Sequence, residues 1–255
     1  MNYIIAAHTD IGIKKSTNQD SFNARVLNTC QGKMVFAILC DGMGGLAKGE
    51  VASATLVRAF MKWVDTRLPE LSQGEIRDSQ IREEWTGIIS TYNEKIKAYG
   101  AAHNISLGTT VTAMLITDTR YYILNVGDTR AYELASGLKI LTKDQTVVAR
   151  DVEMGKITPQ QAMVDPRRSV LLQCVGASEY VYPDMFYGDT QPGAVYMLCS
   201  DGFRHEITEE EIYKYLGPKN SFSEADMERN IRALVELNKS RAEKDNISAV
   251  TVRTF

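Results

Sequence analysis

Two short segments of the 255-residue chain end in the same way. Residues 37–45 read AILCDGMGG and residues 196–202 read YMLCSDG, so each carries an apolar run of strand length into an aspartate and a glycine. Asp128 follows a third such run, while Asp20 and Asp245 stand directly before strand-like segments. In an antiparallel sheet the end of one strand lies beside the start of the next. Carboxylates placed after some strands and before others are therefore expected to gather on one rim.

Such a cluster needs a way to relieve its own repulsion. Carboxylates a few Å apart disfavour each other's ionisation, and protonation or divalent cations resolve the conflict. Oxygen ligands suit Mg²⁺ or Mn²⁺, and the chain has only three histidines, none near another. A single Asp-Gly pair is more typical of a turn. Its repetition at the ends of buried strands favours a site with two or more metal ions, which activates water and holds a phosphoryl group.

The elements that would position these aspartates follow from the spacing of apolar residues. Helical spacing predicts helices at residues 51–64, 81–101, 209–216 and 224–242. Alternation and β-branched residues predict strands at residues 3–7, 21–27, 35–40, 109–117, 121–126, 131–134, 138–141, 194–199 and 246–252.

The order of these elements indicates the fold class. Strands cluster, two helices follow, and strands then return with short turns that imply antiparallel pairing. This pattern favours an α+β fold with two antiparallel sheets flanked by helices. The polar residues 143–175, with weak helical signals near 145–154 and 159–163, are typical of a mobile insert. No repeat or Pro/Ser-rich linker divides residues 1–255, so we predict a single domain.

Composition excludes several classes of protein. The net charge is −3 with scattered Lys and Arg, unlike the basic face of nucleic-acid-binding proteins. No stretch is apolar enough to cross a bilayer, and the start of the chain does not resemble a signal peptide. Cys40 and Cys199 lie inside apolar runs and are predicted to be reduced core residues. We therefore expect a cytoplasmic monomer without nucleic-acid or membrane partners.

Eight short segments follow one another between about residues 9 and 252: TDIGIKKSTNQD, CDGMGG, GEVAS, LGTTVTAMLI, NVGDTRAY, LTKDQT, LCSDGF and DNISAVTV. Each is a weak signal alone, but in this order they resemble the metal-dependent protein phosphatases of the 2C (PPM) type, and bacterial members in particular. The resemblance implies a four-layer α-β-β-α sandwich with Mn²⁺ or Mg²⁺ at one end. It also implies hydrolysis of phosphoserine and phosphothreonine in proteins by a water activated between two ions.

The resemblance further implies a role for each rim residue. Asp41 would bridge two metal ions, and Gly42 would offer its backbone carbonyl to one of them. Asp201 and Asp245 would bind the second ion. Asp128, together with Asp201, would hold a third and weaker ion. Catalysis would then depend on Asp41, Asp201, Asp245 and Lys15, and no cysteine would act as a nucleophile.

The segment that ends at Asp20 departs from the family pattern. Asp20 itself would act through metal-bound waters. The family usually has a phosphate-binding arginine three residues before Asn-Glu-Asp, and here Lys15 and Gln19 take the places of the arginine and the glutamate. We expect Lys15 to bind the substrate phosphate, more weakly than arginine because lysine is a point charge. In the insert, Arg167 and Arg168 are candidates to contact acidic groups of the substrate, with solvated surface charges as the alternative.

The resemblance implies a protein-serine/threonine phosphatase that opposes a bacterial Ser/Thr kinase. Its partners would be phosphorylated protein substrates and a cognate kinase. The alternative, motivated by Lys15 and Gln19, is a catalytically weak relative that binds phosphoproteins. No motif places a histidine as general acid, and this includes His205.

Overall fold

Strand β3 (Gly32–Asp41) is apolar at nearly every position because both of its faces are covered. Phe36 and Ile38 point to one side and pack with helices, whereas Val35 and Ala37 point to the other side and pack against a second sheet. Strand β9 (Val195–Cys199) is buried on both faces in the same way. Successive side chains alternate between faces, so a strand covered on both sides requires an unbroken apolar run.

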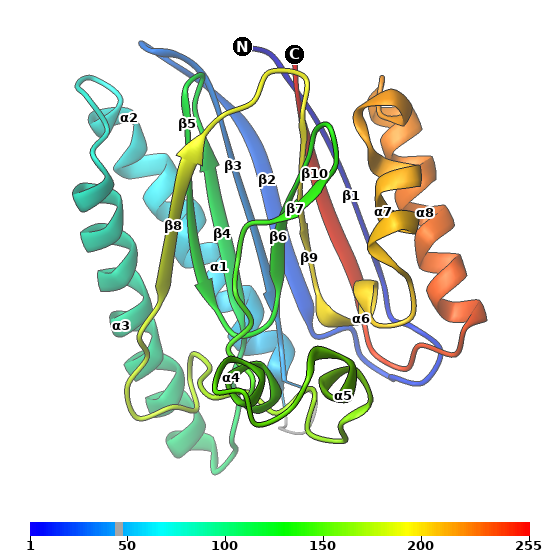
Figure 1. Cartoon of the computed structure of the whole chain (residues 1–255). Coiled ribbons are helices and arrows are strands. Elements are labelled where there is room, and N and C mark those ends of the chain that lie inside the picture. Colours follow the sequence, from blue (N-terminus) through cyan, green and yellow to red (C-terminus); the bar gives the residue numbers. More distant parts are fainter. Residues whose placement is uncertain (44–47) are drawn as a thin grey trace.

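The strands form two five-stranded antiparallel sheets in a computed structural model that describes residues 1–43 and 48–255 (Figure 1). One sheet has the order β2-β3-β4-β5-β8 and the other the order β1-β10-β9-β6-β7. The predicted pair of antiparallel sheets flanked by helices is confirmed. The remaining strands are β1 (Tyr3–Asp10), β2 (Asp20–Thr29), β4 (Val111–Ile116), β5 (Arg120–Val126), β6 (Arg130–Leu134), β7 (Leu138–Ile140), β8 (Asp184–Asp189) and β10 (Ile247–Thr254).

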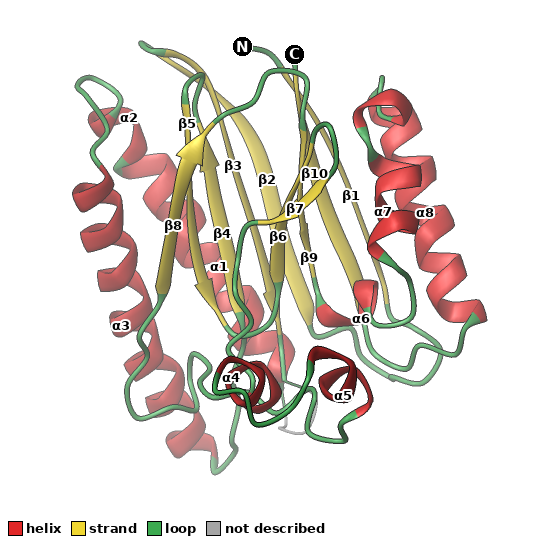
Figure 2. Cartoon of the chain, in the orientation of Figure 1, coloured by secondary structure: helices red, strands yellow, loops and turns green. Residues whose placement is uncertain are grey.

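Helices cover the outer face of each sheet, which completes the four layers (Figure 2). Helices α1 (Gly49–Thr66) and α3 (Asp78–His103) lie on one side, and α7 (Glu209–Leu216) and α8 (Glu224–Ser240) on the other. None of the helices in the described part of the chain has both the length and the apolar character to span a bilayer. The short helical elements are α2 (Leu68–Leu71), α4 (Val147–Glu153), α5 (Pro159–Val164), α6 (Asp201–Arg204) and the 3₁₀ turn η1 (Pro218–Asn220).

A group of aromatic side chains lies between the first sheet and its helices. The rings of Trp63 and Trp85 meet edge to face with centroids 5.5 Å apart, and both contact the ring of Phe36. Aromatic pairs in this geometry stabilise a core beyond the area that they bury. This packing holds α1 and α3 against β3, the strand that ends at Asp41.

Residues 143–175 form the predicted insert, which contains α4 and α5 and lies at the lower end of the sheets in Figure 1. Both ends of the insert are tied to the sheets. The backbone N–H of Gln145 donates to the carbonyl of Gly127 at 2.9 Å, and Thr109 and Val175 exchange two backbone hydrogen bonds. The helical signals in the insert are confirmed, while its mobility stays a prediction.

Candidate active site

Asp20 and Asp41 are direct partners in the register of β2 and β3, so their side chains lie on the same face of the sheet. The end of β3 is fixed by two threonines of the segment that leads into β4. The backbone N–H of Asp41 donates to the Thr110 hydroxyl at 3.0 Å, and the Thr109 hydroxyl donates to the Asp41 carbonyl at 2.9 Å. The carboxylate of Asp41 is thus carried on a rigid strand end.

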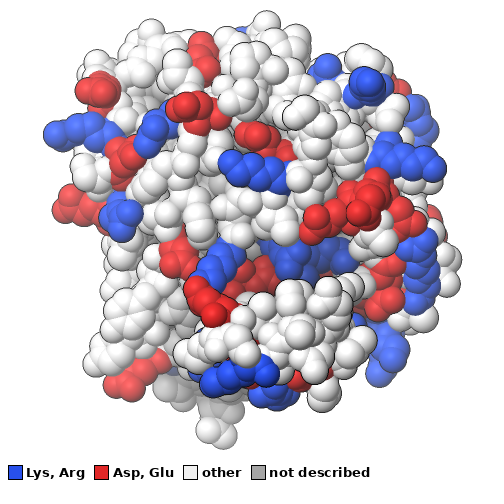
Figure 3. Space-filling model, in the orientation of Figure 1, with Lys and Arg blue, Asp and Glu red and all other residues white. Residues whose placement is uncertain are grey.

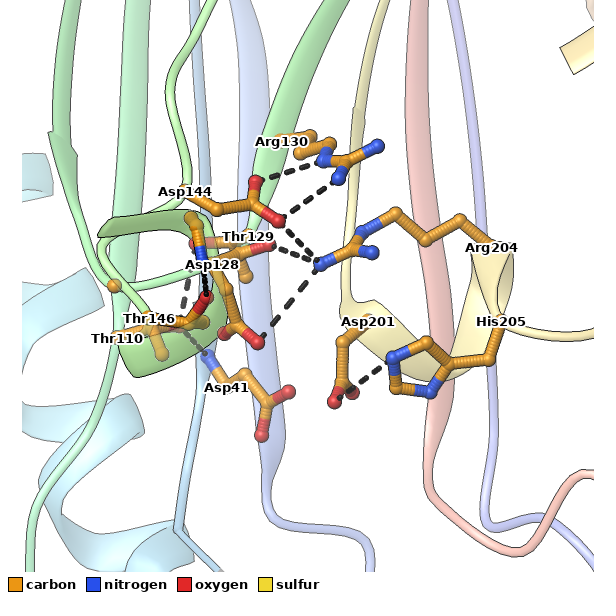
Figure 4. Close-up of polar contacts among 12 residues, drawn as sticks. Asp41, Thr110, Asp128, Thr129, Arg130, Asp144, Thr146, Asp201, Arg204 and His205 are labelled. Atoms are coloured by element: carbon orange, nitrogen blue, oxygen red, sulfur yellow. Dashed lines mark hydrogen bonds and ion pairs between the residues drawn. The ribbon is translucent and has the colours of Figure 1, made fainter. Parts of the chain in front are cut away.

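The five predicted aspartates come together at this rim. Burial and the charges of the other four aspartates raise the pKa of Asp41 well above its usual range. Burial is also the main reason why the pKa of Asp20 and that of Asp128 rise to about 7. Charges influence one another in this way only at short range. Figure 4 shows Asp41, Asp128 and Asp201 directed toward a shared space.

The donor atoms of the cluster fit a hard divalent cation. Asp20 Oδ1 and Asp201 Oδ1 are buried without a hydrogen-bond partner, and carboxylate oxygens are the ligands that Mg²⁺ and Mn²⁺ prefer. In residues 1–43 and 48–255, no group of three Asp, Glu, His or Cys side chains already has the geometry to hold one ion. Ion binding would therefore require side-chain rotations that draw the carboxylates together.

Gly42 lies where three backbone segments meet. A Cβ atom at this position would come within 2.5 Å of the Gly49 carbonyl and within 2.6 Å of the Gln19 carbonyl. The N–H of Gly42 donates to that Gln19 carbonyl at 3.1 Å. Only glycine fits between the start of α1 and the start of β2. The next two glycines of the motif, Gly44 and Gly45, lie outside the described residues.

Asp245 is already paired with Lys15. Lys15 Nζ lies 2.6 Å from Asp245 Oδ1. Burial acts to lower the pKa of Lys15, but the carboxylates of Asp245, Asp41 and Asp201 together raise it. The loop that carries Asp245 is fixed by Glu243, whose Oε1 accepts the backbone N–H groups of Lys244 at 2.6 Å and of Asp245 at 2.8 Å. The structure therefore brings Lys15 into the cluster, as predicted, and shows a carboxylate as its partner.

A pocket of about 330 Å³ opens beside Asp201 and Asp245. Figure 3 shows basic and acidic side chains together in a recess above the insert. The acidic side chains suit cations that hold a phosphoryl group. The basic side chains suit the peptide that carries this group. The other residues that line the pocket are Lys14, Lys15, Arg168, Ser169, His205, Glu243 and Lys244.

His205 is a site residue that sequence reasoning missed. Its Nε2 lies 3.6 Å from Asp201 Oδ2, and its Nδ1 lies 3.6 Å from Glu243 Oε2. Burial acts to lower the pKa of His205, but the nearby carboxylates of Glu243 and Asp201 raise it. The four-residue spacing from Asp201, which places both on one helical turn, is the signal that could have identified it.

Arg167 is directed away from this pocket. Its guanidinium pairs with Asp165 at 2.8 Å and with Asp151 at 3.3 Å, both within the insert. The neighbouring Arg168 lines the pocket instead, 3.7 Å from Glu206. Substrate binding by Arg167 stays a prediction that this arrangement does not support.

The prediction that Cys40 and Cys199 are core residues is confirmed. Both side chains are fully buried and carry free thiols. Burial raises the pKa of the Cys199 thiol to about 12 and that of the Cys40 thiol well above its usual value. A thiol in such surroundings is a poor nucleophile at neutral pH.

Comparisons with known proteins agree with this arrangement. The family model described as protein phosphatase 2C matches residues 12–243. A Streptococcus pyogenes protein described as protein phosphatase 2C-type is 32% identical over 251 residues, which cover 97% of this chain and 96% of that protein. The serine/threonine phosphatase Stp1 from Staphylococcus aureus has a TM-score of 0.86 at 25% identity, covering 100% of this chain and 96% of that one. The catalytic domain of the phosphatase PstP in complex with two manganese ions has a TM-score of 0.77 at 27% identity, covering 98% and 97%.

Proposed function

The chain belongs to the protein phosphatase 2C family and is a protein-serine/threonine phosphatase, and from this premise we propose that its rim aspartates hold two divalent ions for hydrolysis of phosphoserine and phosphothreonine in proteins. The observation that carries the proposal is the convergence of five buried or half-buried carboxylates from two sheets on one rim. The unpartnered oxygens of Asp201 and Asp20 support it, because a cation would satisfy that of Asp201 and a water in the site would satisfy that of Asp20.

Each residue has a task in this proposal. Asp41 and the Gly42 carbonyl would hold the first ion, and Asp41 with Asp201 and Asp245 would hold the second. When bound, Mn²⁺ or Mg²⁺ ions lower the pKa of a shared water and offset charge on the phosphoryl oxygens. Lys15 exchanges its Asp245 partner for a phosphate oxygen and so orients the substrate.

Asp20 supports the site from the inner side of the cluster. Its Oδ2 accepts a hydrogen bond from the Ser248 hydroxyl at 2.6 Å, which fixes the carboxylate. Its free Oδ1 can then accept hydrogen bonds from water in the site. Asp20 therefore positions water without direct contact with an ion.

The proposal also includes the biological setting. A Ser/Thr kinase would supply the phosphorylated proteins that the enzyme dephosphorylates. We place the enzyme in the cytoplasm as a monomer, with residues 1–255 as one catalytic domain and a mobile insert near residues 143–175. Neither nucleic acid nor a membrane is part of the proposed function.

Phosphate release from a phosphothreonine peptide tests the proposal. We expect turnover with Mn²⁺ and none with EDTA. Asp201→Asn should abolish turnover, because it removes one negative ligand from the second ion, while its circular dichroism spectrum stays unchanged. Asp65→Asn, at an exposed position on α1, is the matched control and should retain activity. Inactivity with every divalent ion, or an active Asp201→Asn variant, would contradict the proposed function.

The Lys15–Asp245 pair favours a second candidate, a phosphoprotein-binding relative with weak turnover. In that case Lys15 holds the site closed to phosphate, and the protein binds metal ions with little hydrolysis. The double variant Lys15→Arg with Gln19→Glu would then be much faster than the parent. If the unmodified protein is already as fast as the double variant, this candidate function is excluded.

A further inference from the structure

Asp128 differs from the other rim aspartates because a buried arginine is its partner. Arg204 Nη2 lies 3.8 Å from Asp128 Oδ2 and donates a hydrogen bond to the Asp128 backbone carbonyl at 2.9 Å. The same nitrogen lies 3.2 Å from Asp144 Oδ2. Asp144 is held in turn by Arg130, through Nε at 2.7 Å and Nη2 at 2.8 Å. Two arginines and two aspartates thus alternate along one edge of the cluster (Figure 4).

The position of Arg204 is fixed by burial. Its side chain is 12% exposed, and the side chain of Asp128 is 6% exposed. Moving the guanidinium away would leave the buried carboxyl groups of Asp128 and Asp144 without this partner, which is unfavourable in a buried setting. Arg204 also comes from α6, the helix that begins at Asp201, so the core that positions one rim aspartate also positions this cation.

In the described part of the chain, no arginine pairs with any of the other four rim aspartates. Asp201 Oδ1 and Asp20 Oδ1 are buried and unsatisfied. The other basic side chains paired with a rim aspartate in residues 1–43 and 48–255 are Lys15, which is 30% exposed and contacts Asp245, and His205, whose Nε2 lies 3.6 Å from Asp201 Oδ2. Asp128 therefore has a fixed guanidinium from the chain itself beside it, whereas the unsatisfied oxygens of Asp20 and Asp201 are open to other ligands.

We propose that Arg204 acts as a built-in cation at Asp128, so that the enzyme binds two divalent ions and not a third one there. This inference rests on the proposed two-ion site. An ion on Asp128 would face a guanidinium that already lies within 4 Å of that carboxylate in a buried setting, where like charges repel strongly. The sequence-based expectation of a third ion between Asp128 and Asp201 is the competing possibility.

The number of bound Mn²⁺ ions per chain, measured by equilibrium dialysis and elemental analysis over rising free Mn²⁺, tests this inference. We expect two ions in the unmodified enzyme. Arg204→Met removes the charge and should admit a third ion, whereas Arg204→Lys keeps a charge and should leave the count at two. Arg130→Met removes an equal charge from the same network but not from Asp128, and it should also leave two ions.

Three ions in the unmodified enzyme, or two in a folded Arg204→Met variant, would overturn the role of Arg204. If Arg204→Met does not fold, Asp128→Asn replaces it as the test, since the near-isosteric amide keeps the Asp144–Arg204 pair. That variant should still bind two ions, and a fall in the count relative to the unmodified enzyme would show that Asp128 is a ligand. No bound ion at all would refute the proposed function itself, so the two failures are distinguishable.

Discussion

Lys15 and Gln19 are the residues at which the rim departs from the family pattern, and each has a partner in the chain. Lys15 pairs with Asp245, and Gln19 Nε2 donates to Glu50 Oε2 at 3.3 Å. A glutamate at position 19 would face Glu50 across that distance, and the two carboxylates would repel each other. Glutamine removes this conflict. The loss of a negative charge there is therefore compatible with a well-packed rim.

Replacing Lys15 by methionine tests its role in phosphate binding. A charged hydrogen bond contributes about 1.5–3 kcal/mol, so we expect KM for a phosphothreonine peptide to rise by roughly 10-fold or more. Because the variant also frees Asp245, Mn²⁺ should bind more tightly. The matched control is Lys62→Met, at an exposed position on α1. Equal KM values for the two variants would refute phosphate binding by Lys15.

At the residue scale, the sequence predicts that the aspartates gather on one rim, but it does not predict which side chains contact them. Each aspartate ends or precedes a strand, and that position can be read locally. The contacts of Arg204 with Asp128 and of His205 with Glu243 join residues 76 and 38 positions apart. No periodicity encodes such pairs, because they depend on how β5, α6 and the start of β10 pack together.

Some secondary-structure elements can be predicted from their own residues, and others depend on their neighbours in the fold. Helix α7 has the bounds that the apolar spacing predicts. Its capping residue Thr208 and its buried stripe, which includes Ile212 and Leu216, both indicate a helix over the same residues. Strand β8 was not predicted, and all but its last residue are only partly buried. It exists because β5 offers an edge for pairing and because Gly188 leaves room for the Tyr121 ring. An edge strand of this kind depends on its neighbour more than on its own pattern.

The junction of β3, α1 and the start of β2 supplies a prediction at the element scale. Gly42→Ala would place a Cβ against backbone atoms of Gly49 and Gln19. We expect a loss of roughly 1–3 kcal/mol in the free energy of unfolding and weaker Mn²⁺ binding, because the end of β3 must shift.

Gly87→Ala is the matched control for this variant. Gly87 is an exposed residue within α3, and a Cβ there meets nothing within 4 Å, so alanine should stabilise the protein by about 0.5–1 kcal/mol. Thermal melts and Mn²⁺ titrations compare the two variants. A Gly42→Ala variant as stable as the parent would show that the junction tolerates a side chain.

At the scale of the whole molecule, the candidate site joins the two sheets. Asp20 and Asp41 belong to strands of one sheet, whereas Asp201 and Asp245 flank β9 and β10 of the other. Their mutual repulsion therefore acts across the core that holds the sandwich together. The sequence could predict this layered arrangement, because runs such as β3 and β9 must be covered on both faces. Ion binding and the stability of the fold are expected to be linked.

The most direct measurement of that link is the melting temperature between pH 5 and 8, with and without Mn²⁺. Because the pKa values of Asp20 and Asp128 are about 7, well above their usual range, the metal-free folded state binds more protons than the unfolded chain. Their contribution to stability is present at low pH and is lost as the pH rises through 7. Mn²⁺ binds the deprotonated carboxylates, so the stabilisation that it gives should grow with pH.

We therefore predict a metal-free melting temperature that falls from pH 5 to pH 8, and an Mn²⁺-induced increase that is largest at pH 8. Asp41→Asn removes the carboxyl at the centre of the cluster, so both trends should weaken. Two results together would contradict the central claim, which is that divalent ions relieve the repulsion among the clustered carboxylates. They are a metal-free melting temperature that stays constant or rises over this range, and no stabilisation by Mn²⁺.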